Sequence, residues 1–253
     1  MARTATKKHR APQKVALVTG GGTGLGRATA KALLRDGFTV AVCGRRAERL
    51  KPKHNESFHP YACDIADNAS VKRMVKSVLA DHGRLDVVVN NAGIMRAEKI
   101  GQIKQATIED LVRINLIGTI NVSLATIPAL TKTKGHLIML SSVLSQRPNP
   151  GTAIYSATKG GVESFAKSLA VELAPKKVRC NVVSPALVDT EIYAHALDRP
   201  AFNKLLKERG KAYPLGRAGV PEDISEIVAY LASDHTTWMT GVVIPMDGGR
   251  MVA

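Results

Sequence analysis

Short apolar runs of strand length alternate with helix-length segments along almost the whole chain. The candidate strands span 15–19, 38–43, 57–63, 86–90, 136–141, 178–184 and 242–246. The candidate helices span 24–36, 67–82, 107–130, 153–174 and 221–232. The runs are continuously apolar rather than alternating, as expected for strands buried on both faces of a parallel sheet. This order predicts a doubly wound α/β sheet of about seven parallel strands, with helices on both faces and right-handed crossovers.

The composition fits a single domain over residues 13–253. The chain has 253 residues, of which 45% are hydrophobic and 4% aromatic, so a sizeable and mainly aliphatic core is expected. Residues 1–12 carry several basic side chains and no acid, which predicts a disordered basic arm. A mitochondrial presequence is the alternative for this arm, although the arm lacks an amphipathic pattern.

The formal net charge of +15 raises the question of an anionic partner. Nucleic-acid binding needs clustered Lys and Arg, but beyond the arm the basic and acidic residues are interleaved. No apolar run approaches the length that crosses a bilayer, and no apolar segment near the N-terminus suggests secretion. We therefore expect neither a nucleic-acid nor a membrane partner.

The three cysteines, Cys43, Cys63 and Cys180, lie far apart in the sequence and within apolar stretches. A disulfide or a metal site is one interpretation. Buried reduced thiols in a cytoplasmic protein are the interpretation that we favour, with no metal site.

A glycine-rich turn follows the first candidate strand. The segment Thr19-Gly20-Gly21-Gly22-Thr23-Gly24-Leu25-Gly26 leads directly into a helical pattern. Glycines allow a tight turn and let backbone N–H groups approach a pyrophosphate at the helix N-terminus. The strand–turn–helix context therefore predicts a dinucleotide site.

The second candidate strand ends in Cys43-Gly44-Arg45-Arg46, with no acid at that point. An acid after this strand would bind the ribose 2′-hydroxyl of NAD, whereas arginine binds a 2′-phosphate through paired donors. Arg45 and Arg46 thus favour NADP(H) over NAD(H). Two solvated surface arginines are the alternative.

Tyr155 and Lys159 are four residues apart near the start of a candidate helix and so share one face. A lysine beside a phenol stabilises the phenolate and is expected to lower its pKa, which suits the tyrosine for general acid–base work on a carbonyl. Ser142 ends one candidate strand, and Asn90-Asn91-Ala92-Gly93 ends another. Because the carboxyl ends of parallel strands share one edge, these groups are predicted to converge.

Together these motifs resemble the short-chain dehydrogenase/reductase family, over nearly the whole chain. The family's T-G-x-x-x-G-x-G matches Thr19, Gly20, Gly24 and Gly26, and its N-N-A-G matches residues 90–93. Its Ser-Tyr-Lys set matches Ser142, Tyr155 and Lys159, with the usual gap between serine and tyrosine. Ala186 stands where the family usually has glycine in the loop 184–190. The resemblance implies a Rossmann fold and an enzyme that transfers hydride between NADP(H) and a carbonyl or secondary alcohol.

The resemblance also implies roles for individual residues. The catalytic residues would be Tyr155 as general acid/base, Ser142 polarising the substrate oxygen, Lys159 holding the nicotinamide ribose, and Asn115 anchoring a water relay. Asn115 could instead simply bend its helix, and Ser142 could satisfy backbone groups. The cofactor-binding residues would be Gly20, Thr23, Gly24, Leu25, Gly26, Arg45, Arg46, Asp64, Ile65, Asn91, Ala92, Gly93, Tyr155, Lys159, Pro185, Val188 and Thr190.

The segment 190–214 is predicted to form a lid over the substrate site. Ile192, Tyr193, Ala194 and Leu197 would give it an apolar inner face, and Met95, Val143, Leu144 and Tyr193 are the expected substrate contacts. His195 and Arg147 are the nearby polar groups considered for orienting a substrate, and solvated side chains are the favoured interpretation of both. The expected substrate is a mainly apolar small-molecule ketone or alcohol rather than a free sugar.

Two further expectations follow from the resemblance. The family usually assembles through the helices that carry Asn115 and Tyr155, so a homotetramer or homodimer is expected. A catalytically silent dinucleotide-binding sensor or scaffold is the alternative function. Such proteins often lose the tyrosine or the lysine, and this chain has both.

Overall fold

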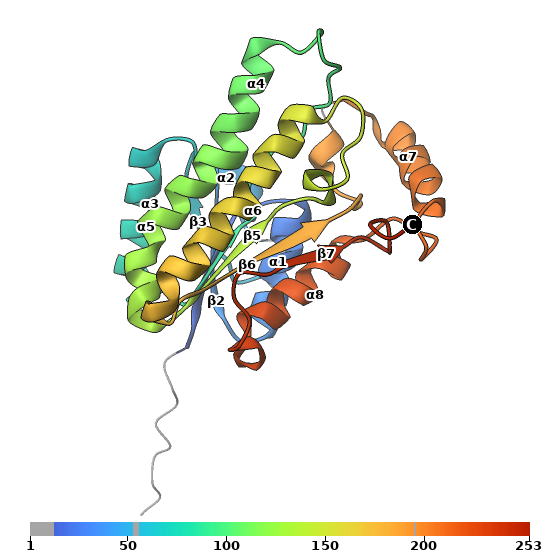
Figure 1. The fold of residues 1–253 in the computed structure, drawn as a ribbon. Helices are drawn as coiled ribbons and strands as arrows, with labels where there is room; N and C mark the ends of the chain where they lie inside the picture. Colours follow the sequence, from blue (N-terminus) through green and yellow to red (C-terminus); the bar gives the residue numbers. More distant parts are fainter. Residues whose placement is uncertain (1–12, 53–55, 195) are drawn as a thin grey trace, which may run out of the picture.

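The computed structural model describes residues 13–52, 56–194 and 196–253, so the predicted basic arm, residues 1–12, lies outside the described residues. Seven parallel strands form one sheet in the order β3-β2-β1-β4-β5-β6-β7 (Figure 1). The strands are β1 (Val15–Thr19), β2 (Thr39–Gly44), β3 (His59–Ala62), β4 (Val87–Asn90), β5 (His136–Leu140), β6 (Arg179–Pro185) and β7 (Val243–Met246). The predicted doubly wound parallel sheet is confirmed, and each strand lies within two residues of its predicted bounds.

Helices cover both faces of the sheet (Figure 1). Helices α1 (Gly24–Arg35) and α8 (Pro221–Ala232) pack on one face, and α3 (Asn68–His82), α5 (Gly118–Thr133) and α6 (Ala153–Leu173) pack on the other. The remaining helices are α2 (Ala47–Leu50), α4 (Gln105–Leu111) and α7 (Arg199–Lys211). The single helix predicted over 107–130 is α4 and α5 joined by a π-helical turn, Val112–Ile117. Sequence reasoning missed α2, and it recognised α7 only as a lid with helical character.

Each central strand contributes to two cores. In β1, Leu17 packs into the core under α3, α5 and α6, whereas its neighbour Val18 packs into the core under α1 and α8. Successive side chains of a strand point to opposite faces, so a strand covered on both sides must be apolar at every position. This explains the continuous apolar runs in the sequence.

The continuous helical segment Gln105–Thr133 is long and apolar enough to cross a membrane, judged by length and composition alone. Half of its apolar window is buried inside the protein, and α5 packs against α3 and β4. Its hydrophobicity is accounted for by its place in the core. The three cysteines are buried and not disulfide-bonded, as predicted.

The amino ends of the strands hold a set of buried polar side chains. Asp86 accepts from the amide of Val15 at 2.8 Å and from the Arg84 guanidinium at 2.7 and 2.9 Å. The His136 ring contacts the Leu231 carbonyl at 2.8 Å and the Asn181 amide at 2.9 Å. The polar side chains at this end of the sheet are thus hydrogen-bonded to other groups of the protein.

Candidate active site

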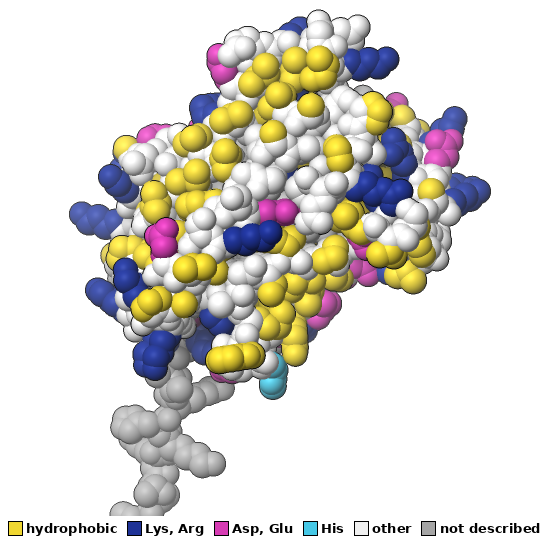
Figure 2. Space-filling view, viewed as in Figure 1, with side chains coloured by type: hydrophobic (Ala, Val, Ile, Leu, Met, Phe, Trp, Pro, Cys, Tyr) yellow, Lys and Arg dark blue, Asp and Glu magenta, His cyan; other side chains and the backbone are white. Residues whose placement is uncertain are grey.

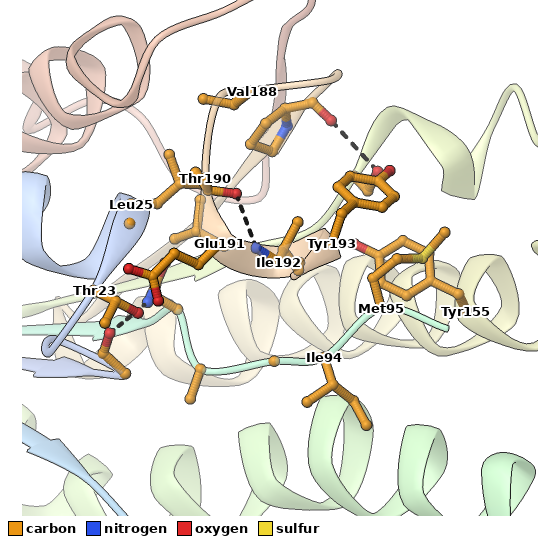
Figure 3. Close-up of a pocket in the computed structure, with 18 of the residues that line it drawn as sticks. Thr23, Leu25, Ile94, Met95, Tyr155, Val188, Thr190, Glu191, Ile192 and Tyr193 are labelled. Carbon is orange, nitrogen blue, oxygen red and sulfur yellow. Dashed lines mark hydrogen bonds between the residues drawn. The ribbon is translucent and has the colours of Figure 1, made fainter. Parts of the chain in front are cut away.

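A cavity of about 740 Å³ runs along the carboxyl ends of the strands. Its walls come from the glycine-rich turn, from the loops after β2 to β6, and from the segment 185–194 that crosses over them. Figure 3 shows Thr23 and Leu25 at one end and Met95, Tyr155 and Tyr193 at the other. The strand ends thus bring segments far apart in the sequence into one elongated site.

The glycine-rich turn is fastened to the loop after β4. The Thr19 hydroxyl accepts from the amides of Asn91 and Ala92, both at 3.0 Å, and the Asn91 side chain donates to the Thr19 carbonyl at 2.9 Å. Gly20 has a φ of 65°, and a Cβ at Gly26 would lie 2.2 Å from the Gly20 oxygen. The turn is therefore possible only with glycines, and it places the N-terminus of α1 against the cavity.

These features fit a dinucleotide. Gly20, Gly22 and Gly24 line the cavity, and a Cβ at Gly24 would come within 3.3 Å of Thr190 on the opposite wall. Arg45 and Arg46 are exposed at the same end, following β2. A pyrophosphate would meet backbone N–H groups at the α1 N-terminus, and a ribose phosphate would meet the two guanidiniums.

Ser142, Tyr155 and Lys159 are all buried and all line the cavity. The Ser142 hydroxyl accepts from the Leu144 amide at 3.2 Å and contacts the Pro185 carbonyl at 3.4 Å. Lys159 Nζ donates to the Leu140 carbonyl at 2.8 Å and lies 5.8 Å from the centre of the Tyr155 ring. The three side chains predicted from β5 and α6 therefore share one site.

Burial shifts both titrating groups of this set toward their neutral forms. It raises the pKa of the Tyr155 phenol, Tyr193 raises it further, and a hydrogen bond with Ser142 acts in the opposite direction. Burial also lowers the pKa of Lys159 to about 8, against the attraction of Glu163. The sequence predicted a net lowering of the phenol pKa; the net pKa is instead raised, because desolvation is the largest influence on it. The phenol is held protonated at neutral pH.

Asn115 lies beside the site rather than on the cavity wall. Its side chain is fully buried in the π-helical turn, accepts from the Ile94 amide at 2.8 Å and donates to the Ile94 carbonyl at 2.9 Å. A Cβ at Gly93 would lie 3.1 Å from the Asn115 oxygen and 3.6 Å from Lys159 Nζ. The asparagine thus joins the loop after β4 to the helix, and a side chain at position 93 would crowd the Asn115 oxygen.

A buried carboxylate, Glu163, lies one helical turn after Lys159. It accepts from the hydroxyls of Ser141 at 2.7 Å and Ser145 at 2.6 Å, and from the Gln146 amide at 3.3 Å. These contacts connect α6 to the loop that carries Ser142. Sequence analysis did not single out Glu163, although its spacing from Lys159 places it on the same helix face.

The segment that was predicted to form a lid contributes to the wall at the other end of the cavity. The segment Glu191–Tyr193 forms a short 3-10 turn, and Tyr193 stacks on Phe202 of α7 with ring centres 5.4 Å apart. Tyr193 also packs against the cluster of Met95, Leu111, Leu144 and Tyr155, and Figure 3 shows it on the same side of the cavity as Met95 and Tyr155. This end of the cavity is thus lined by apolar and aromatic groups from the strand ends and from the segment Glu191–Tyr193.

Most of the predicted site residues lie on the cavity wall. The exceptions are Gly26, which packs under the turn, Asn115, and Leu197. Arg147 also lies off the wall, with its guanidinium on the carbonyls of Arg250 and Ala253, and His195 lies outside the described residues. The wall also contains side chains that sequence reasoning missed: Arg49, Arg96, Leu205, Arg209, Tyr213 and Arg250.

Fold and site together define a dinucleotide-dependent oxidoreductase of the Rossmann type with a Ser-Tyr-Lys set. A family model described as enoyl-(acyl carrier protein) reductase matches residues 20–250. The chain belongs to the short-chain dehydrogenase/reductase family.

Similar curated proteins are named 3-oxoacyl-[acyl-carrier-protein] reductase FabG. The protein from Thermotoga maritima is 33% identical over 94% of this chain and 98% of its own length. The protein from Staphylococcus aureus is 38% identical over 93% of this chain and 97% of its own length.

Solved structures with the same fold include two named dehydrogenases or reductases. The 3-ketoacyl-(acyl-carrier-protein) reductase from Brucella melitensis, complexed with NADH, has a TM-score of 0.86 at 31% identity and covers 94% of this chain and 98% of its own. The ligand-free aldohexose dehydrogenase from Thermoplasma acidophilum has a TM-score of 0.88 at 28% identity, covering 95% of each chain. The protein is therefore an oxidoreductase of the class that acts on carbonyl or alcohol groups.

Proposed function

We propose that this protein is an NADP(H)-dependent reductase that converts a small-molecule ketone to a secondary alcohol, with Tyr155 as the general acid. The observation that carries the proposal is the meeting of Ser142, Tyr155 and Lys159 in the same cavity as the glycine-rich turn. A phenol whose pKa is raised by burial stays protonated at neutral pH, and that is the form that can donate a proton to a carbonyl oxygen.

The chain's own side chains divide the work. When bound, the nicotinamide supplies the hydride. Ser142 orients the substrate oxygen, and Tyr155 donates its proton to that oxygen as the C=O bond is reduced. The Lys159 ammonium, a cation below pH 8, stabilises the phenolate that remains and holds the ribose. Asn115 is a positioning residue, because it holds Gly93 and Ile94 beside Lys159.

Turnover of a ketone panel with NADPH tests this function. Tyr155→Phe should remove nearly all turnover, while binding of the cofactor, followed by calorimetry, should remain. If Tyr155→Phe keeps more than about a tenth of the parent rate, proton transfer belongs to another group. A parent protein that binds NADPH but reduces no carbonyl would instead support the alternative, a catalytically silent sensor or scaffold.

The preference for NADP(H) rests on Arg45 and Arg46. Both are exposed at the cofactor end of the cavity, and they occupy the two positions directly after β2, where a carboxylate would favour NAD(H). Charge-assisted contacts to a 2′-phosphate should give at least about tenfold higher kcat/KM with NADPH than with NADH. Arg45→Asp should shift the preference toward NADH. Equal kcat/KM with both cofactors in the parent protein would contradict the assignment. Among the solved relatives, the Brucella reductase has NADH bound and ElxO has NADP bound.

Assembly and location complete the proposal. The outer surfaces of α5 and α6 expose Leu124 and Val171, and Figure 2 shows hydrophobic side chains scattered over this face. They support a homotetramer with two-fold axes, or a homodimer, formed through these helices. Light scattering at micromolar concentration tests this, and a monomeric mass would overturn it. The three reduced, buried cysteines support a cytoplasmic location.

A further inference from the structure

The substrate end of the cavity carries positive charge that the proposed ketone reduction does not use. Arg209 and Arg250 line the wall there, and Arg96 lines it near Met95. Among the described residues, the carboxylates on the wall are Asp64 and Glu191, and both belong to the cofactor end. Glu191 is paired with Arg49 at 2.7 Å, and Figure 3 shows it near Thr23 rather than Tyr155.

Arg209 reaches the cavity because of the way α7 packs. Phe202 stacks on Tyr193, which itself lies against Tyr155 and Met95. Leu205 and Arg209 follow Phe202 by three and seven residues, so all three lie on one helix face. Both Leu205 and Arg209 line the cavity. The helix therefore presents an apolar side chain and then a cation beyond Tyr193.

Arg250 reaches the same wall from the other direction. The chain after β7 lies beside the end of α7 (Figure 1), where the Leu215 amide donates to the Gly248 carbonyl at 3.1 Å. A Cβ at Gly249 would lie 2.8 Å from Pro214, so glycine permits this close contact. One nitrogen of Arg250 donates to the Arg147 carbonyl at 3.1 Å and to the Asn149 side chain at 2.9 Å. The guanidinium is thus held in place by neutral groups.

Neighbouring arginines of this region are neutralised, whereas these two are not. Arg199 is paired with Asp189 at 2.5 Å, and Arg217 with Asp223 at 2.6 Å. Within the described part of the chain, neither Arg209 nor Arg250 has a carboxylate within 4 Å. Arg96 differs, since Glu98 lies close enough for Arg96 to help lower the pKa of that carboxyl.

The charges of Arg209 and Arg250 both act on Tyr193. Burial raises the pKa of the Tyr193 phenol and Tyr213 adds to this, while Arg209 and Arg250 both lower it. Tyr193 in turn packs against the cluster that contains Tyr155 and raises the pKa of that phenol. A substrate whose carbonyl lies at Tyr155 would therefore extend past Tyr193 toward the two guanidiniums.

We infer that the substrate carries an anionic group, a carboxylate or a phosphate, separated from its carbonyl by an apolar segment, and that Arg209 and Arg250 bind this group. Planar guanidiniums with unpaired N–H donors match the oxygens of either group. The apolar segment lies along Met95, Leu144, Tyr193 and Leu205. This inference rests on the proposed reduction at Tyr155, and it replaces a simply apolar ketone with an amphipathic one.

The test uses two pairs of ligands, each with one anionic and one neutral member on the same apolar spacer. The first pair is 8-oxodecanoate and its methyl ester, and the second is 8-oxodecyl phosphate and 8-oxodecan-1-ol. Binding is measured by calorimetry to the enzyme saturated with oxidised NADP, so no hydride is available and the result does not depend on turnover. Reduction of neutral ketones with NADPH is measured separately and tests the proposed function.

The variants are Arg209→Gln and Arg250→Gln. Because Arg250 also holds Asn149, its variant is checked by thermal unfolding, while Arg209 is exposed and its variant should fold normally. The matched control is Lys207→Gln, which removes an exposed cation from the same helix away from the cavity wall.

We expect the charged member of one pair to bind at least about tenfold more tightly than its neutral partner. This advantage should largely disappear in Arg209→Gln and in Arg250→Gln and persist in Lys207→Gln. An effect in the first pair identifies a carboxylate, and one in the second pair a phosphate. No detectable binding, equal affinity within both pairs, or an advantage that survives both arginine variants overturns the inference, even if neutral ketones are still reduced.

Discussion

Both ends of the sheet bury polar side chains. Those at the amino ends are bonded to other groups of the protein, whereas those at the carboxyl ends line a cavity. At the amino ends, the His136 ring contacts the Leu231 carbonyl and the Asn181 amide, and the Asp86 carboxylate accepts from an amide and a guanidinium. At the carboxyl ends, the hydroxyl of Tyr155 and the ammonium of Lys159 are equally buried but face a cavity.

The difference separates structural polar groups from reactive ones. A buried group whose hydrogen bonds are completed by the protein lowers the energy of the fold and is not available to a ligand. A buried group that lines a cavity has lost part of its hydration, which costs free energy. It remains available to contact a ligand or to take part in a reaction. Burial alone would not have told the two ends apart. Substitutions should therefore harm stability at one end and activity at the other.

The largest expected effect is at Lys159. Lys159→Met should lower kcat for ketone reduction by roughly a thousandfold, because the phenolate left after proton transfer loses its cation. In the parent enzyme, kcat should also fall above pH 8, where Lys159 loses its charge. Steady-state kinetics from pH 6 to 10 check this, with Lys167→Met, an exposed lysine of the same helix, as the control.

Stability should change in the opposite sense for the same variant. The pKa of Lys159 falls from 10.5 to about 8 on folding, so the unfolded chain holds this proton more tightly. The free-energy cost of burying the charged lysine is therefore complete below pH 8 and absent above pH 10.5. Lys159→Met should raise the free energy of unfolding at pH 7, by up to about 3 kcal/mol. Urea denaturation measures it, and a marked loss of stability would show that Lys159 belongs with the structural groups.

Asp86→Ala should give the reverse result. It removes the acceptor for the Val15 amide and the carboxylate that pairs with the partly buried Arg84 guanidinium. Losing the acceptor of a buried amide together with a partly buried ion pair should cost about 2 kcal/mol of unfolding free energy. The kcat per folded molecule should stay within about twofold of the parent value. A thousandfold loss of kcat in folded Asp86→Ala would break the distinction between the two ends.

A smaller effect is expected from pH at His136. Burial lowers the pKa of His136 from 6.5 to about 3, so the unfolded chain binds the proton first as the pH falls. The stability that this neutral ring contributes is complete above pH 6.5 and is lost progressively toward pH 3. Between pH 7.5 and 5.5 this residue should account for about 1.4 kcal/mol of lost stability. In His136→Gln that part of the pH dependence should vanish, and an unchanged slope would contradict the assignment.

The fold and the carboxyl-end chemistry could be predicted because they depend on local patterns. Continuous apolar runs follow from burial on both faces, and a strand end next to Ser142, with Tyr155 and Lys159 on one helix turn, needs no knowledge of distant contacts. The glycine-rich turn is equally local, since its φ values and close contacts exclude other residues.

What the sequence did not reveal depends on how distant segments pack. Arg209 faces the cavity only because Phe202 stacks on Tyr193, and Arg250 only because the chain after β7 returns beside the end of α7. Glu163 resembles any charged helix residue until the serines after β5 are placed next to it. The pKa of Tyr155 was misjudged because burial, which a sequence does not display, dominates it.

The π-helical turn at Val112–Ile117 lets one continuous helical segment serve both the site and the core. The Gly118 amide donates to the carbonyl of Arg113, five residues back, so this turn holds one residue more than an ordinary helical turn. The extra residue is accommodated within the turn itself. Deleting one residue here would restore a regular helix and leave Val122 and Thr126 of α5 in the core, while Asn115 would lose its place beside Ile94. The widened turn thus confines the change of backbone geometry to the residues beside the site and spares the packing of the sixteen residues of α5.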